Sequence, residues 1–421
     1  MKIESKCLHA GYEPKNGEPR VLPIYQSTTY KYDSTDFVGQ LFDLTAEGHM
    51  YSRISNPTVD AVEKKIAALE GGVGALCTTS GQSATFLALM NVLESGDHLV
   101  ASSTIYGGTV NLLSITFQKF GIEVSYVDPD ADAKEIERLI RPNTKAIFGE
   151  IMANPAMNVL DIEKFASVAH AHDIPLFVDN TFATPVLCQP FRFGADIVIH
   201  STTKYMDGHA LQVGGVIVDG GTFNWANGKF PGLSTPDASY HGIVYTDTFQ
   251  EAAYITKARV QLMRDLGCYP AAHSAFLLNL GLETLAVRME RHCANAQRAA
   301  EFLEAQDAVE FVNYPGLKQD KYHALAQKYL PKGCCGVVSF SIKGGRERAA
   351  AFIDHLKMVS LEVHVADIRT CILHPASSTH RQLTDEQLVN CGITQGLIRL
   401  SCGIEHIDDI LEDFTQAFEQ L

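Results

Sequence analysis

The chain has 421 residues, of which 46% are hydrophobic and 20% charged, values that are ordinary for a globular protein and exclude wholesale disorder. Lys and Arg number 34 against 49 Asp and Glu, so the net charge is −15 and we expect no nucleic-acid partner. No apolar run is long enough to cross a bilayer, and residues 1–7 carry no apolar signal core. We therefore expect a cytoplasmic protein with no membrane partner. The ten Cys form no C-x-x-C pair, so we expect reduced thiols and no metal site.

The first two thirds of the chain alternate between strand-like and helical patterns. Residues 1–60 are rich in Tyr, Pro, Gly and Thr without periodicity, which predicts an irregular arm. Helical spacing predicts a helix over residues 58–69, ended by Gly71 and Gly72. Helical patterns then separate several strand-like runs, which are 75–79, 98–101, 123–127, 146–150, 175–178, 196–200 and 214–218. This alternation predicts an α/β protein with a mostly parallel sheet covered on both faces.

The remaining third predicts a second, smaller domain. Residues 219–247 form a Gly-, Pro- and Asn-rich insertion with the single Trp225, and loops of that length are usually functional or loosely ordered. From residue 255 to about 305 the pattern is helical, with breaks near Gly267 and Pro270. We expect an N-terminal arm (1–60), a large domain (61–258) and a smaller α/β C-terminal domain (259–421).

An acid and a lysine follow two neighbouring predicted strands. Asp179 ends the strand at 175–178, and Lys204 follows the strand at 196–200. Ligands of open α/β sheets bind beyond the carboxyl ends of the strands, so both groups are candidates for a binding site. Taken alone, this pair slightly favours a plain salt bridge or a solvated strand end.

A turn at Gly81 and Gln82 connects a strand to a helix start, which aims backbone N–H groups and the positive end of the helix dipole at an anion. Ser201 and Thr203 add hydroxyls just before Lys204. Taken alone, the turn is more consistent with an ordinary helix N-cap. A phosphate cradle, a lysine and an acid together suggest pyridoxal phosphate (PLP). Its aldehyde forms a Schiff base with a lysine, and a carboxylate keeps its pyridine nitrogen protonated.

Two further side chains fit this hypothesis. Tyr106 lies in a loop after the strand at 98–101, where it could stack on the ring; a core or surface tyrosine is the alternative. Arg399 is a single charge inside an apolar strand-like run. Its planar fork suits the α-carboxylate of an amino-acid substrate, and an internal salt bridge is equally consistent.

The sequence resembles the Cys/Met-metabolism family of PLP enzymes over nearly its whole length. The segments that carry the resemblance are YSRISNPT (51–58), TTSGQSA (78–84), IYGGT (105–109), VDNTFATP (178–185), ADIVIHSTTKY (195–205), GGVIV (214–218) and RLSCGIEHIDD (399–409). The resemblance implies PLP as the cofactor and fold type I, the aspartate-aminotransferase type.

The resemblance also implies roles for the cofactor-binding residues. Lys204 would be the Schiff-base lysine, Asp179 the partner of the pyridine nitrogen, and Tyr106 the stacking ring. Asn154 would lie near the ring hydroxyl. The phosphate would be held by Gly81, Gln82, Ser201 and Thr203.

Other roles concern the substrate and a second subunit. Arg399 would bind the substrate carboxylate. Tyr51 and Arg53 would reach the phosphate of a neighbouring subunit, which implies an obligate homodimer, commonly doubled into a tetramer. Tyr51 would also contact substrate and, with Tyr106 and Lys204, take part in proton transfer.

Three features favour the O-acetylhomoserine sulfhydrylases within this family: the insertion segment 230–242, the segment HPASSTHRQLT (374–384) and the long chain. These enzymes use sulfide to convert O-acetyl-L-homoserine to L-homocysteine and acetate in methionine biosynthesis. Methionine γ-lyase and cystathionine γ-synthase or lyase activity stay open as alternatives, although Gly108 stands where methionine γ-lyases often carry Cys. Ala366 stands where many sulfhydrylases have Gly before the Asp, here Asp367. The choice between acetyl and succinyl esters, and between sulfide and larger thiols, stays open.

Overall fold

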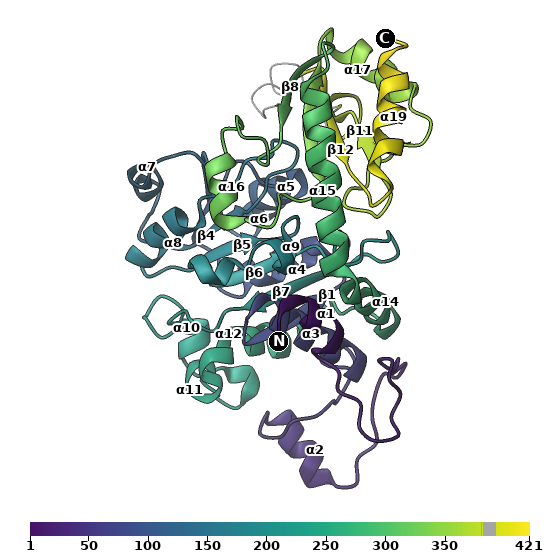
Figure 1. Ribbon diagram of the computed structural model, residues 1–421. Helices are drawn as coiled ribbons and strands as arrows, with labels where there is room; N and C mark the ends of the chain where they lie inside the picture. The colour runs from purple at the N-terminus through teal and green to yellow at the C-terminus, as the bar shows by residue number, and fades with distance from the viewer. Residues whose placement is uncertain (380, 382–392) are drawn as a thin grey trace.

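The computed structural model describes residues 1–379, 381 and 393–421, which fold around two sheets (Figure 1). The larger sheet has the strand order β1-β7-β6-β5-β4-β2-β3. β7 lies antiparallel to β1 and β6, and the other neighbours run parallel. The predicted α/β class with a mostly parallel sheet is confirmed. The strands are β1 (Gly74–Thr78), β2 (His98–Ser102), β3 (Glu123–Val127), β4 (Thr144–Glu150), β5 (Leu176–Asp179), β6 (Ile197–His200) and β7 (Gly215–Asp219).

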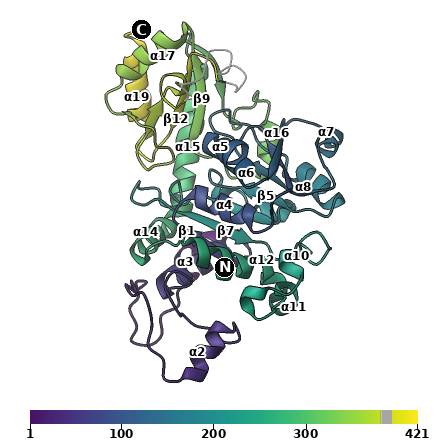
Figure 2. The ribbon, with the colours of Figure 1, turned by 180° about the vertical axis from the view of Figure 1, so that it is seen from behind.

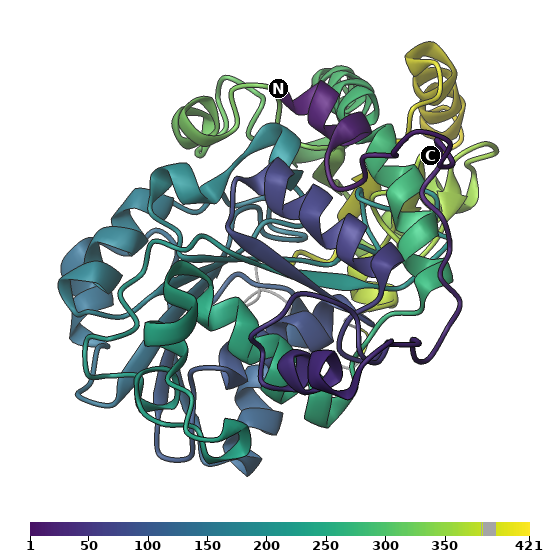
Figure 3. The same ribbon diagram turned by 90° about the horizontal axis from the view of Figure 1, so that it is seen from below.

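The two faces of the large sheet are buried in separate hydrophobic clusters because successive side chains of a strand point to opposite faces. Val178 and Val198 lie in the cluster that includes α3 (Pro57–Glu70). Phe177 and Ile199 lie in the cluster that includes α4 (Gly81–Met90). Figure 3 shows helices on both sides of the sheet. Because β4, β5 and β6 run parallel to one another, their carboxyl ends lie together at one edge of the sheet.

Further helical segments accompany this sheet. They are α5 (Gly107–Asn111), η1 (Leu112–Thr116), α6 (Phe117–Lys119), α7 (Ala133–Arg138), α8 (Ile162–Ala171), α9 (Thr184–Leu187), η2 (Pro190–Phe193), α10 (Pro231–Ser234), η3 (Ala238–Tyr240), α11 (Tyr245–Phe249), η4 (Gln250–Ala252), α12 (Ala253–Lys257), η5 (Ala258–Met263) and α13 (Arg264–Leu266).

The N-terminal arm is more regular than the sequence predicts, because it contains two helices. α1 (Ile3–His9) packs against α3, and the Lys65 ammonium donates to the Cys7 carbonyl at 2.9 Å. Cys7 is the single buried residue of this short helix, so no spacing between apolar residues indicates a helix in the sequence. α2 (Thr35–Phe42) lies at the tip of the arm, away from both sheets (Figure 1). The predicted helix over 58–69 is confirmed as α3, which ends at Gly71 with φ +85°.

The insertion at 219–247 is folded against the large sheet. Trp225 is buried and stacks on the ring of Tyr254, with centroids 5.0 Å apart and planes 17° apart. Phe230 and Leu233 are buried in the same cluster. The insertion is therefore a packed layer of the protein.

The smaller sheet has the order β10-β11-β12-β9-β8 and is joined to the large one by a long helix (Figures 1 and 2). Its strands are β8 (Val309–Asn313), β9 (Val337–Ile342), β10 (Ser360–Leu361), β11 (Cys371–Leu373) and β12 (Leu397–Ser401). The joining helix is α15; the helical segments of this part are α14 (Ala272–Glu283), α15 (Leu285–Glu304), α16 (His323–Tyr329), α17 (Gly345–Asp354), η6 (Pro375–Ser377) and α19 (Ile407–Phe418). The domain boundaries at residues 60 and 258 stay predictions.

Among the described residues, no helix has the length and apolar character needed to span a bilayer. The same residues contain no group of three or more His, Cys, Asp or Glu that could hold a metal ion.

Candidate active site

The carboxyl ends of three parallel strands bring the predicted acid and lysine together. In the register of the sheet Glu150 of β4 pairs with Asp179 of β5, and Asp179 pairs with Ile199 of β6. Lys204 follows β6 by one turn, in which its N–H donates to the Ser201 carbonyl at 3.2 Å. Asp179 and Lys204 thus emerge from adjacent strands at one edge, as the sequence predicts.

Thr181 fixes the carboxylate of Asp179. Its backbone N–H and its hydroxyl both donate to Asp179 Oδ1, at 2.9 and 2.5 Å. The Thr181 hydroxyl oxygen also accepts the N–H of Ser201 at 2.8 Å, which ties the ends of β5 and β6 together. Burial raises the pKa of Asp179, while the Thr181 hydrogen bonds and the charge of His200 oppose that shift. Oδ2 makes no hydrogen bond within the described ranges, so it is available to a ligand.

The start of α4 has the geometry of an anion site. Ser80 and Ser83 form a capping box that uses their own two amides. The amides of Gly81 and Gln82 lie between them, and first-turn N–H groups have no acceptor inside the helix. A Cβ atom at Gly81 would lie 2.6 Å from the Cβ of Ser201, so only glycine allows this approach.

Thr203 lies in the same turn but its hydroxyl already has two partners. It donates to the Gly214 carbonyl at 3.2 Å and accepts the Gly214 N–H at 3.0 Å. The Ser201 hydroxyl, in contrast, lies against Gly81 at the helix start. Ser201 is therefore better placed than Thr203 to meet an anion there.

Lys204 has an unusually acidic ammonium. Burial, and then the positive charge of Arg399, lower its pKa to about 8. A lysine amine with a lowered pKa is a stronger nucleophile near neutral pH than an ordinary lysine, because more of it is deprotonated. The residue can therefore react with an aldehyde or accept a proton.

Arg399 reaches this site from β12 of the smaller sheet. Its Nη2 donates to the carbonyls of Val363 and His364, at 2.9 and 3.1 Å, while Nε is buried without a partner. No carboxylate of the described residues forms an ion pair with it, which leaves the internal salt bridge without support. Burial lowers the pKa of Arg399, opposed by the neighbouring Cys371 and Tyr106. A buried, unpaired guanidinium suits an anionic ligand.

Tyr106 lies at the start of α5 with its side chain 52% exposed. Its N–H donates to Glu150 Oε2 at 2.8 Å. A Cβ atom at Gly108 would lie 2.5 Å from the Tyr106 ring and 3.1 Å from the Gln82 side chain. The absence of a side chain at position 108 thus allows the ring to take this place beside Gln82.

Asn154 follows β4, and its side-chain Oδ1 is buried without a hydrogen-bond partner. Buried polar atoms are nearly always paired, so Oδ1 of Asn154 and Nε of Arg399 indicate that a polar ligand completes the site. Together with the amides at α4, the acid and the lysine, these donors and acceptors fit the phosphate, the ring and the aldehyde of PLP.

Tyr51 and Arg53 lie on the arm. The Arg53 guanidinium is 5.3 Å from the centre of the Tyr51 ring and donates to the Arg264 carbonyl. Tyr51 is 44% exposed and forms a bridge with Thr29. Within the described residues, no hydrogen bond joins either side chain to Lys204 or to the start of α4.

Three side chains at this edge are absent from the sequence hypothesis: Glu150, Thr181 and His364. Burial, and then the charge of Asp179, raise the pKa of Glu150 well above its ordinary value. His364 has a buried Nε2 without a partner, and burial and the charge of Lys204 lower its pKa. Glu150 ends a predicted strand beside Asp179, so the strand pattern could have indicated it. His364 comes from a distant loop, which no local pattern links to Lys204.

The backbone at Ala366, just before Asp367, adopts the left-handed conformation. Ala366 has φ +68°, a conformation that costs a residue with a Cβ about 1 kcal/mol and that favours glycine. Residues 380 and 382–384 of the segment 374–384 lie outside the described residues. Within that segment, His374 Nε2 lies 2.8 Å from the Gln395 carbonyl.

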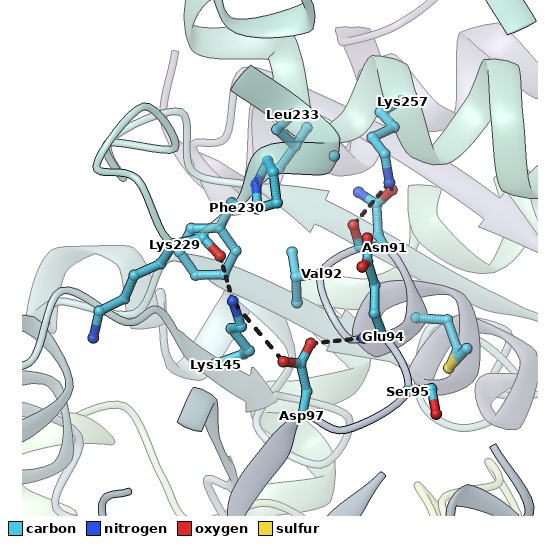
Figure 4. A pocket seen from close by; sticks show the side chains of 13 residues that line it. Asn91, Val92, Glu94, Ser95, Asp97, Lys145, Lys229, Phe230, Leu233 and Lys257 are labelled. Atoms are coloured by element: carbon cyan, nitrogen blue, oxygen red, sulfur yellow. Dashed lines mark hydrogen bonds and ion pairs between the residues drawn. The ribbon is translucent and has the colours of Figure 1, made fainter. Parts of the chain in front are cut away.

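A separate cavity of about 100 Å³ lies at the amino ends of β2 and β4 (Figure 4). Lys257 donates there to the Asn91 carbonyl at 2.9 Å, and Lys145 lies 3.9 Å from Asp97. None of the candidate site residues lines it.

The structural relatives are PLP-dependent enzymes. A crystal structure of a Campylobacter jejuni protein assigned as an O-acetylhomoserine (thiol)-lyase, with a pyridoxyl-lysine phosphate, superposes with a TM-score of 0.95; it is 39% identical and each chain covers 100% of the other. The MetB protein of Corynebacterium glutamicum superposes with a TM-score of 0.85 at 34% identity, covering 100% of this chain and 98% of that one. The fold is therefore that of PLP-dependent enzymes of fold type I, as predicted.

Sequence relatives define the family. Residues 4–419 match the Cys/Met metabolism PLP-dependent enzymes. The O-acetyl-L-homoserine sulfhydrylase of Leptospira meyeri is 46% identical over 100% of this chain and 97% of its own. The homocysteine synthase of Schizosaccharomyces pombe is 46% identical over 99% and 98%. This chain belongs to the Cys/Met metabolism family of PLP-dependent enzymes, and PLP is its cofactor.

Proposed function

We propose that this chain catalyses a γ-replacement in which sulfide displaces acetate from O-acetyl-L-homoserine to give L-homocysteine, a step in methionine biosynthesis. One observation carries the proposal: Lys204, with a pKa lowered to about 8 by burial and by the unpaired Arg399, follows β6 at the same edge of the sheet where Asp179 ends the neighbouring β5. The names of the relatives, O-acetyl-L-homoserine sulfhydrylase and homocysteine synthase, support this substrate and product.

The cofactor-binding roles follow from the same arrangement. Lys204 would bond the PLP aldehyde, Asp179 would pair with the pyridine nitrogen and Tyr106 would stack on the ring. Asn154 would meet the ring hydroxyl. Gly81, Gln82 and Ser201, with Thr203 in support, would hold the phosphate. When bound, PLP withdraws electrons from the substrate and so stabilises negative charge at its α-carbon.

The substrate's α-carboxylate binds the fork of Arg399, which turns the Cα–H bond toward Lys204. The Lys204 amine takes the α-proton, a role that its lowered pKa supports at neutral pH. Removal of a β-proton lets the acetate leave from Cγ, and sulfide adds at that carbon. Tyr106, and Tyr51 of a second subunit, move protons near Cγ. Return of the protons then releases homocysteine.

The assembly we propose is a homodimer, doubled into a tetramer, in which the arm completes the neighbour's site. The exposed Tyr51 ring and the Arg53 guanidinium above it support this role. Mixing Lys204→Ala and Arg53→Ala chains would test it. Because a mixed dimer has one site with both changes and one intact site, about a quarter of the parental activity returns if sites are shared. No recovery on mixing would contradict shared sites.

We also propose a cytoplasmic location, since the nine cysteines of the described residues are all free and thiols stay reduced there.

The direct test incubates the purified protein and PLP with O-acetyl-L-homoserine and sulfide and measures homocysteine and acetate. Parallel reactions replace the ester by O-succinylhomoserine and sulfide by methanethiol, which identify the leaving group and the acceptor. Methionine alone tests for γ-lyase activity, seen as a keto acid and ammonia. Homocysteine formation that disappears in Lys204→Ala supports the proposal. Turnover of methionine without formation of homocysteine would contradict the proposed γ-replacement and support methionine γ-lyase activity.

A further inference from the structure

A buried carboxylate lies behind the cofactor-facing ends of β5 and β6. Glu70, the last residue of α3, accepts hydrogen bonds on Oε1 from His200 Nε2 at 2.6 Å and Asn180 Nδ2 at 2.9 Å. The side chains of Glu70 and His200 are fully buried, and Asn180 has no exposed surface. Each of the two donors stands next to a site residue in the chain, Asn180 after Asp179 and His200 before Ser201.

This cluster is the second of two links between the same strand ends. On the ligand side, the Thr181 hydroxyl joins Asp179 Oδ1 to the N–H of Ser201. Behind it, Glu70 joins the neighbouring residues Asn180 and His200 from a helix outside the sheet. The strand ends are therefore held from both faces, and α3 sets their position.

The charges point the same way. A fully buried carboxylate is costly without a partner, and the Nε2 atom of His200 lies 2.6 Å from Glu70 Oε1, a contact that becomes an ion pair when the imidazole is protonated. Burial raises the pKa of Asp179, and the two Thr181 hydrogen bonds and, after them, His200 oppose that shift. The Cys188 thiol also faces Glu70, and burial and the Glu70 charge raise its pKa, so that it stays neutral.

We infer that Glu70 is a positioning residue for the cofactor: through His200 and Asn180 it holds Asp179 and Ser201 in register. This inference rests on the proposed roles of Asp179 and Ser201. It predicts that removal of the Glu70 charge changes the binding and the ionisation of PLP, and not only the stability of the fold.

The same strands carry a matched control at their opposite ends. Asp196 accepts from His170 Nε2 at 2.9 Å and from the N–H of Leu176 at 2.8 Å, so it ties the amino ends of β5 and β6 as Glu70 ties the carboxyl ends. Asp196→Asn should lower stability and leave PLP binding unchanged.

The experiment titrates PLP into cofactor-free parent, Glu70→Gln and Asp196→Asn, and then follows the absorbance of the bound cofactor against pH. Glu70→Gln keeps an acceptor oxygen but loses the charge, and we expect it to weaken PLP binding by about tenfold, the lower end of the effect of outer-shell partners at metal sites. A ring that holds its proton less firmly leaves the nitrogen bonded to Lys204 more basic, so the absorbance transition should move to higher pH. His200→Gln, which keeps a donor but no charge, should move the transition in the same direction.

Parental affinity and an unmoved transition in Glu70→Gln would overturn the inference. If Glu70→Gln does not fold, an unchanged pH of the absorbance transition in His200→Gln would overturn the inference. A parent protein that binds no PLP would instead overturn the proposed function, and the inference with it.

Discussion

Arg399 lowers the pKa of Lys204 although the two residues belong to different sheets. Arg399 lies on β12, and its charge acts with burial to bring the pKa of Lys204 to about 8. The guanidinium that we propose to bind the substrate carboxylate and the amine that we propose to react are thus electrostatically coupled. An anion bound at Arg399 would weaken its effect on Lys204, so the proposed functions link substrate binding to the chemistry of the amine.

The first prediction concerns the pH dependence of Lys204. Because its pKa is lowered from 10.5 to about 8, the amine of the cofactor-free protein is mostly deprotonated above pH 8. Its acylation rate should rise with pH up to about 8 and then level off, as measured by competitive labelling and mass spectrometry. Arg399→Ala should move this midpoint upward. A midpoint near that of the exposed lysines would contradict the assignment.

Loss of the acid at the end of β5 should slow the chemistry. Asp179→Asn removes the charge that we propose keeps the pyridine nitrogen protonated, so kcat should fall by about 100-fold or more. The control is Asp219→Asn, a buried Asp at the other edge of the sheet, which should leave kcat unchanged. Equal effects of the two changes on kcat would mean that Asp179 acts only on the fold.

Arg399→Ala should act chiefly on substrate binding. Removal of a charge-assisted, two-pronged contact costs about 1.5–3 kcal/mol, which corresponds to a rise in KM of about 10- to 150-fold. Arg399→Lys keeps the charge but loses the fork, and its KM should lie between those of parent and Arg399→Ala. Steady-state kinetics with O-acetyl-L-homoserine measure both. An unchanged KM in Arg399→Ala would mean that another group binds the substrate carboxylate.

Two adjacent glycines offer a matched test of the Tyr106 ring. A Cβ at Gly108 meets the ring at 2.5 Å, whereas a Cβ at Gly107 meets nothing within 4 Å. Gly108→Ala should displace the ring and weaken PLP binding by about tenfold, a loss of about 1.4 kcal/mol of stacking and contact. Gly107→Ala should bind PLP like the parent. The same PLP affinity in both variants would mean that the Tyr106 ring does not contact the cofactor.

Local patterns predict the strands of the large sheet well. The alternation that gives β5 and β6 also gives their ends, so the sequence alone places Asp179 and Lys204 at one edge of the sheet. The turn at Gly81 is readable for the same reason, since a strand, a glycine and a helix start are consecutive in the chain.

Contacts between distant segments cannot be predicted from local sequence patterns. Glu70 meets His200 across 130 residues, and a glutamate at the end of an amphipathic helix resembles any solvated helix terminus. His364 similarly reaches the site from a loop of the smaller sheet. The helix α1 is not predicted because its single buried residue, Cys7, cannot establish a period.

The most direct test of the central claim is to reduce the PLP-bound protein with borohydride and map the modified lysine by peptide mass spectrometry. Lys257 is an internal control, because burial lowers its pKa to about 8 as well, yet it lies in the cavity at the other edge of the sheet. The account predicts a pyridoxyl group on Lys204 and none on Lys257. Modification of Lys257 or another lysine, with Lys204 unmodified, would contradict it.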